Sequence, residues 1–370
     1  MQQRVIISQD IEHDLAQAIA ETEHDRVFVL TDDITQECCL PKVAVLFAKH
    51  NATTITIRHD DTNKTLATLA DVWTTLQRSG ATRHSLLVNL GGGMVTDLGG
   101  FAAATFKRGI NFINIPTTLL AMVDAAVGGK TGINFGGLKN EVGAFANARY
   151  VIVNTCFLDT LDTANLCSGY AEMLKHSLIS NAQMWAEHVN FDILQPDLAE
   201  LQRMVAASIA VKEHIVADDP HEHGIRKALN FGHTIGHALE EFSMQQPGGA
   251  VVSARLLPLA KARTAPKNTL LHGYAVAFGL IGELYISARK AGFPTARLHQ
   301  TARFIRENYG AVAFTCDDYP TLLNLMRHDK KNTSDTINFT LLHDIGDIRI
   351  NQTATDEEIR EALDFIREGY

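Results

Sequence analysis

Two histidines four residues apart are the first feature of this sequence that could do chemistry. They are His233 and His237, in the segment HEHGIRKALNFGHTIGHALEE at residues 221–241. In a helix this spacing stacks both imidazoles on one face, and Arg226 and Asn230 precede them at the same interval. A histidine pair at i and i+4 is a common arrangement for binding a metal ion. The pattern differs from HExxH, which excludes the metalloprotease motif, and a pair of core histidines is the alternative interpretation.

A carboxylate and a third histidine complete a candidate ligand set. Glu172 and Lys175 lie three residues apart in SGYAEMLKHSL and share one face of a predicted helix, where a structural ion pair is the alternative. His272 begins the next helix, in LLHGYAVAFGL. Glu172 and two imidazoles from three separate helices would leave one coordination position open, as a catalytic zinc ion requires. The spacing leaves open whether His233 or His237 is the ligand.

Glycine-rich segments follow two of the predicted strands. In NLGGGMVTDLGG, residues 89–100, the glycines let the backbone turn tightly and approach a pyrophosphate, which the next helix would bind through its N–H groups. The pattern is GGGxxxD and not GxGxxG, so it does not establish a Rossmann site, and a tight structural turn is the alternative. The second segment, residues 116–140, suits a phosphorylated or polyhydroxyl ligand, with a solvated loop as the alternative. Its polar residues are Thr117, Thr118, Asp124, Lys130, Lys139 and Asn140.

The first part of the chain alternates strands and helices. Short apolar and β-branched runs predict strands, and apolar residues at helical spacing predict a helix over Lys64–Gly80. The predicted strands are Arg26–Thr31, Thr53–Ile57, Ser85–Leu90 and Ile110–Ile115. This alternation indicates an α/β fold with a Rossmann-like parallel-sheet domain over residues 1–154.

From residue 155 to residue 370 we expect a mainly α-helical metal-binding domain. Its predicted helices are Ser168–Asn181, Leu198–Val216, Leu229–Phe242, Gly273–Ala291 and Leu298–Asn308, with a hairpin formed by TINFTLL and DIRI near the end. This organisation predicts a ligand cleft between the domains, at the carboxyl ends of the strands. The Gly-, Pro- and Arg-containing segment Gln245–Asn268 is expected to be a surface excursion between two helices.

Composition limits the classes of function. The 370 residues include 33 basic and 42 acidic side chains, a formal net charge of -9, which argues against a nucleic-acid-binding surface. The five cysteines contain no CxxC pair and fit a reducing compartment. The N-terminus does not resemble a signal peptide, and no apolar run approaches the ~18 residues of a membrane span. We therefore expect a cytoplasmic protein that binds neither nucleic acid nor membrane.

Together the motifs resemble those of the 3-dehydroquinate synthases. The similarity extends in family order from about Arg26 to the C-terminal hairpin, through GGGMVTD, RGINFINIPTTLLAMVDAAVGGKTGIN, GLKNEVGAF, SGYAEMLKH, IRKALNFGHTIGHALE and LHGYAVAFG. The resemblance implies an NAD-binding α/β domain, a helical metal-binding domain and a homodimer. Tyr274 departs from the family, which usually has Glu at this position.

The resemblance also implies roles for individual residues. Glu172, His233 and His272 would bind the metal ion, which would be zinc, with cobalt as the alternative. NAD would contact Asp32, Asp61, Lys64, Gly92, Gly93, Met94, Asp97, Thr117, Thr118, Lys139 and the turn from Phe157 to Thr160. The substrate would contact Arg108, Asp124, Lys130, Asn140, Lys175, Lys212, Arg226, Asn230, His237 and Lys330. The catalytic set would be Glu222, His237, Lys175 and Asp124, with Glu222 and His237 in acid–base roles.

The implied reaction converts a small acidic sugar phosphate, 3-deoxy-D-arabino-heptulosonate 7-phosphate, to 3-dehydroquinate and phosphate. It would proceed by transient oxidation with NAD, phosphate elimination, re-reduction and aldol cyclisation, without net redox change. The Lys and Arg residues suit a substrate that is anionic at both ends. The alternatives are another sugar phosphate cyclase, a metal-dependent NAD polyol dehydrogenase of the glycerol dehydrogenase type, and a non-catalytic relic that binds NAD or metal.

Overall fold

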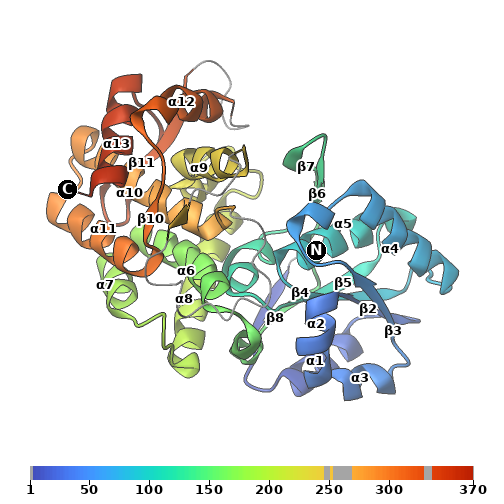
Figure 1. Cartoon of the computed structure of the whole chain (residues 1–370). Coiled ribbons are helices and arrows are strands. Elements are labelled where there is room, and N and C mark those ends of the chain that lie inside the picture. Colours follow the sequence, from blue (N-terminus) through green and yellow to red (C-terminus); the bar gives the residue numbers. More distant parts are fainter. Residues whose placement is uncertain (1–2, 246–250, 253–268, 329–335, 370) are drawn as a thin grey trace. The chain divides into compact units, whose positions relative to one another are not determined.

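The chain forms two compact units in a computed structural model that describes residues 3–245, 251–252, 269–328 and 336–369 (Figure 1). Unit 1 comprises Met1–Leu161 and Asp197–Ile209, and unit 2 comprises Asp162–Pro196 and Ala210–Tyr370. No helix in the described ranges is long and apolar enough to cross a membrane.

Unit 1 is built on a parallel six-stranded sheet with the order β1-β8-β5-β4-β2-β3. Its strands are β1 (Arg4–Ile7), β2 (Val27–Asp32), β3 (Thr53–Ile57), β4 (Leu86–Gly91), β5 (Asn111–Pro116) and β8 (Tyr150–Val153). Every residue of β2, β4 and β8 is buried, whereas the edge strands β1 and β3 contain exposed residues. This pattern is expected of a parallel sheet covered by helices. The parallel-sheet prediction is confirmed, and its four predicted strands match β2, β3, β4 and β5 to within about one residue.

Helices and one hairpin complete unit 1. The helices are α1 (Ile11–Glu21), α2 (Asp33–Cys38), α3 (Ala44–Lys49), α4 (Leu66–Arg78) and α5 (Gly93–Thr105), with short helical turns η1 (Leu40–Lys42), η2 (Asp61–Asn63), η3 (Phe106–Arg108), η4 (Ala121–Ala125) and η5 (Thr155–Thr160). The antiparallel hairpin of β6 (Lys130–Phe135) and β7 (Leu138–Phe145) was not predicted. Gly132 and Gly143 face each other across it, and a Cβ atom on Gly143 would lie 2.1 Å from the carbonyl oxygen of Thr131.

Unit 2 is mainly helical, as predicted. It contains α6 (Thr163–Leu178), α7 (Ala182–Asn190), the end of α8 (Leu198–Asp218), α9 (His233–Gln245), α10 (His272–Lys290), α11 (Thr295–Tyr309), α12 (Tyr319–Arg327) and α13 (Asp356–Glu368), with the turns η6 (Ile225–Asn230) and η7 (Cys316–Asp318). Its strands are β9 (Val251–Val252), β10 (Ala311–Val312), β11 (Asn338–Asp344) and β12 (Asp347–Thr353). The β11–β12 pair confirms the predicted C-terminal hairpin. The predicted Gln245–Asn268 excursion lies outside the described residues, apart from Gln245 and β9.

One predicted helix is wrong in its extent. The sequence predicted a continuous helix over Leu229–Phe242, but α9 begins at His233, and Arg226 and Asn230 lie in the separate turn η6. The break is at Gly232, whose φ of +81° is a conformation that glycine adopts readily. Arg226 and Asn230 therefore do not continue the helix face that carries His233 and His237.

Candidate active site

Helices α6, α9 and α10 approach one another closely in unit 2. A Cβ atom on Gly279 of α10 would lie 1.9 Å from the carbonyl oxygen of Gly232, and one on Gly273 would lie 1.8 Å from that of Ser168 in α6. Gly236 of α9 lies against Ala275 of α10. These pairs show that α9 and α10 run in opposite directions, and only glycine allows this separation of the backbones.

Three candidate ligands converge where these helices meet. Glu172 of α6 is fully buried, and its Oε1 lies 3.3 Å from Nε2 of His233 and 3.4 Å from Nε2 of His272. One ligand atom from each residue lies within 4.8 Å of the others. His237 lies nearby, with its ring centroid 5.3 Å from that of His233. Of the two histidines on α9, His233 is thus the one that joins the ligand set.

The second nitrogen of each imidazole is anchored. Nδ1 of His272 lies 3.0 Å from Oε2 of Glu240, and Nδ1 of His233 lies 3.2 Å from the carbonyl oxygen of Phe231. In the neutral tautomer, an Nδ1–H that donates to these acceptors leaves an Nε2 lone pair turned toward Glu172. Metal-binding histidines in proteins usually have such a partner on the other nitrogen.

This donor set fits a divalent metal ion. Neither carboxylate oxygen of Glu172 has a hydrogen bond within the described part of the chain, although Lys175 contacts Oε2 as an ion pair. When both imidazoles are neutral, a buried carboxylate that faces two nitrogen lone pairs is repulsive unless a proton or a metal ion lies between them. Two imidazoles and a carboxylate are the ligands that zinc and cobalt accept.

The charges in the cluster perturb its titration. Burial alone would raise the pKa of Glu172, but the Lys175 ammonium and the His233 imidazole outweigh it and hold the pKa well below its ordinary value. Burial would lower the pKa of His272, but Glu240 and Glu172 outweigh it and raise the pKa to about 10. The pocket therefore attracts positive charge strongly.

Buried polar side chains of unit 2 include three of its six predicted substrate residues. Lys175, Lys212 and Arg226 are all buried. Arg226 donates from Nη1 to the carbonyl oxygen of Pro220 at 2.6 Å. Nδ2 of Asn230 donates to Oε1 of Glu222 at 2.6 Å, which brings these two predicted residues together. Lys330 lies outside the described residues.

In unit 1 a second group of predicted residues forms a connected network. Nζ of the buried Lys64 lies 2.5 Å from Oδ2 of Asp97 on α5 and 2.5 Å from Oδ1 of Asn140 on β7. Lys139 lies 3.5 Å from Asp61. Burial raises the pKa of Asp97 despite the attraction of Lys64. Lys64 thus joins Asp97, which like Lys64 is expected to contact NAD, to Asn140, which is expected to contact the substrate.

The glycine segment after β4 has the features of a phosphate site. Gly92 precedes α5, and no side chain caps this N-terminus among the described residues. A Cβ atom on Gly92 would lie 3.0 Å from Thr118, and one on Gly93 would lie 3.2 Å from Ala125. The bare backbone and the free N-terminal N–H groups fit a pyrophosphate, and Met94 is the next residue of α5.

The remaining predicted residues of unit 1 lie at the ends of strands and in turns. Asp32 caps α2, and burial raises its pKa. Thr117 donates its N–H to the carbonyl oxygen of Gly91. The other positions are Arg108 in η3, Asp124 in η4, Lys130 at the start of β6, and Phe157 and Thr160 in η5.

Sequence reasoning missed two carboxylates that support the ligand set. Glu240 holds His272, and Glu283 of α10 accepts hydrogen bonds at the N-terminus of α9. The available signal was an acidic residue on an otherwise apolar helix face, such as Glu283 in GLIGEL. Burying such a carboxylate is costly unless its charge is paired, so its position indicates a partner in the fold.

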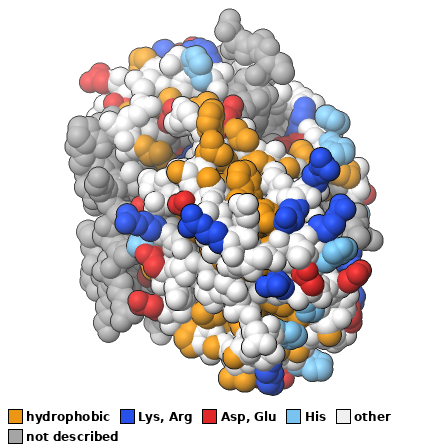
Figure 2. All heavy atoms as spheres, turned by 90° about the vertical axis from the view of Figure 1, so that its right-hand side faces the viewer, with side chains coloured by type: hydrophobic (Ala, Val, Ile, Leu, Met, Phe, Trp, Pro, Cys, Tyr) orange, Lys and Arg blue, Asp and Glu red, His pale blue; other side chains and the backbone are white. Residues whose placement is uncertain are grey.

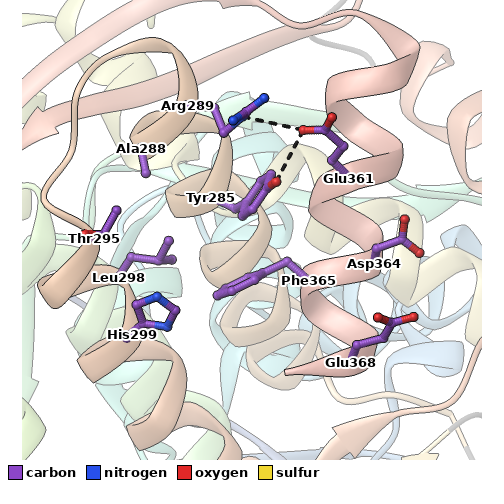
Figure 3. Close-up of a pocket in the computed structure, with 10 residues that line it drawn as sticks. All are labelled: Tyr285, Ala288, Arg289, Thr295, Leu298, His299, Glu361, Asp364, Phe365 and Glu368. Carbon is purple, nitrogen blue, oxygen red and sulfur yellow. Dashed lines mark hydrogen bonds and ion pairs between the residues drawn. The ribbon is translucent and has the colours of Figure 1, made fainter. Parts of the chain in front are cut away.

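A separate cavity of about 680 Å³ lies between α10, α11 and α13 (Figure 3). None of the predicted site residues lines it. Glu361 points toward Tyr285 and Arg289 and contacts both, at 3.3 and 3.6 Å (Figure 3). The cavity is therefore distinct from the candidate ligand set.

Comparison with known proteins identifies the family. Residues 54–168 match the sequence model described as 3-dehydroquinate synthase N-terminal, and residues 169–257 and 260–332 match the one described as 3-dehydroquinate synthase C-terminal. The chain belongs to the 3-dehydroquinate synthase family. A 3-dehydroquinate synthase of Parabacteroides distasonis is 50% identical over 369 residues, which cover 100% of this chain and 99% of the relative. The chain thus has 3-dehydroquinate synthase function in the shikimate pathway, with a sugar phosphate as its substrate.

Solved structures support the fold of this 3-dehydroquinate synthase. A 2-deoxy-scyllo-inosose synthase complexed with carbaglucose-6-phosphate, NAD+ and Co2+ is similar with a TM-score of 0.81 and 23% identity, covering 100% of this chain and 96% of that one. A 2-epi-5-epi-valiolone synthase from Streptomyces hygroscopicus with NAD+ and Zn2+ bound has a TM-score of 0.80 and 23% identity, covering 100% and 98%. The predicted fold class, a parallel-sheet domain followed by a helical domain, is confirmed.

Proposed function

We propose that this enzyme uses NAD and one divalent metal ion, zinc or cobalt, to convert 3-deoxy-D-arabino-heptulosonate 7-phosphate to 3-dehydroquinate and phosphate. The observation that carries the proposal is the convergence of Glu172, His233 and His272, with both Nδ1 atoms anchored. The two structural relatives that hold NAD+ together with Co2+ or Zn2+ support it. When bound, the metal ion would polarise a substrate oxygen and NAD would accept and return a hydride.

In this proposal the two halves of the chain bind different ligands. An NAD-binding domain over residues 1–154 uses the N-terminus of α5, with Gly92, Gly93 and the Lys64–Asp97 pair. A metal- and substrate-binding domain over residues 155–370 supplies the three ligands. The further proposed NAD contacts are Asp32, Asp61, Met94, Thr117, Thr118, Lys139, Phe157 and Thr160.

Cationic side chains hold the anionic substrate in this proposal. Lys175, Lys212 and Arg226 are buried, so they are less screened by water and bind phosphate or carboxylate more strongly than exposed cations do. The other proposed substrate contacts are Arg108, Asp124, Lys130, Asn140, Asn230, His237 and Lys330. A neutral polyol would not need this number of cations.

Two side chains, Glu222 and His237, are proposed to move protons. The Glu222 carboxylate is held by the hydrogen bond from Asn230, and the His237 ring lies 5.9 Å from that of His272. Glu222 and His237 take up and return protons at the substrate, while Lys175 and Asp124 complete the catalytic set. Lys175 keeps Glu172 ionised and therefore able to act as a ligand.

A homodimer and a cytoplasmic location belong to the same proposal. Phe135, Leu138 and Phe145 of the β6–β7 hairpin are each more than half exposed, which favours a partner surface. Figure 2 shows apolar side chains gathered in a band among Lys and Arg on one face of the molecule. All five cysteines are free thiols, as a reducing compartment favours. Sedimentation equilibrium tests the dimer, and a monomer at micromolar concentration would contradict it.

The decisive experiment follows phosphate and dehydroquinate together. Stoichiometric release of both from the heptulosonate phosphate, with zinc, catalytic NAD and no accumulating NADH, is expected. Glu172→Ala should abolish zinc binding and turnover while NAD affinity is kept, because the ligand is lost within unit 2. Glu213→Ala, which removes an exposed carboxylate from α8, is the matched control. Full activity of Glu172→Ala would reject the ligand assignment.

A further inference from the structure

The N-terminus of α9 is capped by a side chain from another helix. Helices are usually capped by the side chain of the residue before them, but here that residue is Gly232, which has none. Its place is taken by Glu283, three turns into α10. Glu283 is fully buried, and an unpaired carboxylate there would be strongly destabilising.

The Glu283 carboxylate bridges the backbone on either side of His233. Its Oε2 accepts from the N–H of Gly232 at 2.7 Å. Its Oε1 accepts from the N–H of Thr234 at 2.9 Å and from that of Ile235 at 3.2 Å. The negative charge also interacts favourably with the helix dipole of α9. The backbone that carries His233 is therefore fixed by one residue of α10.

The same face of α10 carries the second histidine ligand. His272 and Glu283 are eleven residues apart, which places them about 20° apart around the helix axis. At one end of the α9–α10 contact Glu283 holds the N-terminus of α9, and at the other His272 contacts Glu240. The distance between His233 and His272 is thus determined by the Glu283 and Glu240 carboxylates and by the close approach of α9 and α10 at Gly236 and Gly279.

We propose that Glu283 is a positioning residue of the metal site. Its hydrogen bonds at Gly232, Thr234 and Ile235 go to backbone N–H groups, and it acts by holding the first turn of α9 so that His233 meets Glu172 and His272. The inference rests on the proposed metal site. A helix whose first turn is loosened would present His233 in a range of positions and would bind the ion less tightly.

The test compares zinc affinity in Glu283→Gln, Glu283→Asp and Ser287→Ala. In Glu283→Gln one amide oxygen can still accept from Thr234 and Ile235, but the NH₂ group faces the N–H of Gly232. Ser287 is the matched control because it is buried one turn further along α10 and accepts from the N–H of Leu342, away from α9. Glu283→Asp keeps the negative charge but shortens the side chain by one methylene, which moves the carboxylate away from the N–H groups of α9.

Zinc dissociation constants come from competition with a chromophoric chelator, and amide exchange is followed at Thr234 and Ile235. We expect Glu283→Gln and Glu283→Asp to weaken zinc binding about 10-fold or more and to speed exchange at both amides, while Ser287→Ala keeps wild-type affinity even with a lower Tm. Wild-type affinity in both Glu283 variants, or equal weakening in Ser287→Ala, would overturn the positioning role. Failure of the wild-type protein to bind zinc would instead reject the proposed metal site.

Discussion

Replacing Lys64 by methionine would leave the Asp97 carboxylate buried without its cation. The Lys64 side chain is 4% exposed and that of Asp97 is 18% exposed, with 2.5 Å between Nζ and Oδ2. Breaking a pair this well buried costs about 3–5 kcal/mol. Because burial already raises the pKa of Asp97 above 3.8 while Lys64 lowers it, loss of Lys64 must raise the pKa further.

The rise in the pKa of Asp97 predicts how the stability loss of Lys64→Met depends on pH. Below pH 3.8 the carboxyl is protonated in both the folded and the unfolded chain, so the substitution costs little beyond lost contacts. Above the pKa of Asp97 in the folded wild type, which itself lies above 3.8, the wild-type carboxyl ionises while that of the variant stays protonated, so the variant loses up to about 1.4 kcal/mol of unfolding free energy per pH unit relative to wild type. The electrostatic part of the loss should therefore be larger at pH 7 than at pH 5.

The chain provides its own probe for this measurement. It has two tryptophans, and Trp73 on α4 donates to the carbonyl oxygen of Ala102 on α5, the helix that carries Asp97. In a Trp185→Phe background, urea unfolding of the NAD-free protein can be followed by Trp73 fluorescence at pH 5 and pH 7. Adding Asp97→Asn to Lys64→Met should recover most of the loss at pH 7. An equal loss at both pH values, or no recovery in the double variant, would refute the reasoning.

Two further outcomes follow from side chains around the ligands. Glu240→Ala should weaken zinc binding about 10- to 100-fold, because the Nδ1–H of His272 loses its acceptor; unchanged affinity in chelator competition would contradict this. Tyr274→Phe should raise the free energy of unfolding by up to about 1 kcal/mol, because the buried hydroxyl has no hydrogen bond among the described residues. Its zinc affinity should not change. A loss of stability in thermal unfolding would contradict this prediction.

Four of the six strands of the sheet, β2 to β5, were predicted because their local sequence is rich in apolar and β-branched residues, whereas β1 and β8 were not predicted. Runs such as SLLVNL are mainly apolar, as a strand covered on both faces requires. The β6–β7 hairpin was not predictable in this way, since its apolar residues are separated by polar residues and glycines and form no continuous apolar run. Its strands pair because Gly132 and Gly143 allow a close approach, which depends on residues distant from each other along the chain.

The candidate ligands were predictable by residue type, but spacing alone could not choose between His233 and His237; only the family resemblance implied His233. Helix propensity continues smoothly through IRKALN, so the sequence predicted one helix with Arg226 and Asn230 on its ligand face. The break at Gly232 depends on φ and on the cap from Glu283, which is fifty-one residues away in the sequence. Local sequence contains no information about such a contact.

The Tyr274 departure from the family has a structural explanation. The ring is buried and meets that of Tyr309 edge to face at 5.0 Å, and the Tyr309 hydroxyl donates to the carbonyl oxygen of Cys167. Burial raises the pKa of Tyr274, so the phenol stays neutral. Tyr274 therefore contributes to the aromatic packing behind His272 and is not part of the ligand set.

Helix α8 has a consequence for dissecting the protein into fragments. Its first half, up to Ile209, completes unit 1, where Gln202 donates to the carbonyl oxygen of Ser8 and accepts from the hydroxyl of Thr155. A recombinant fragment that stops at residue 161 would lack these partners and expose apolar surface left by the missing helix. Neither unit is a contiguous piece of chain, so the gene cannot be cut at one point into two independently folding halves. Complementation by co-expressed fragments, and not truncation, is the way to study the units separately.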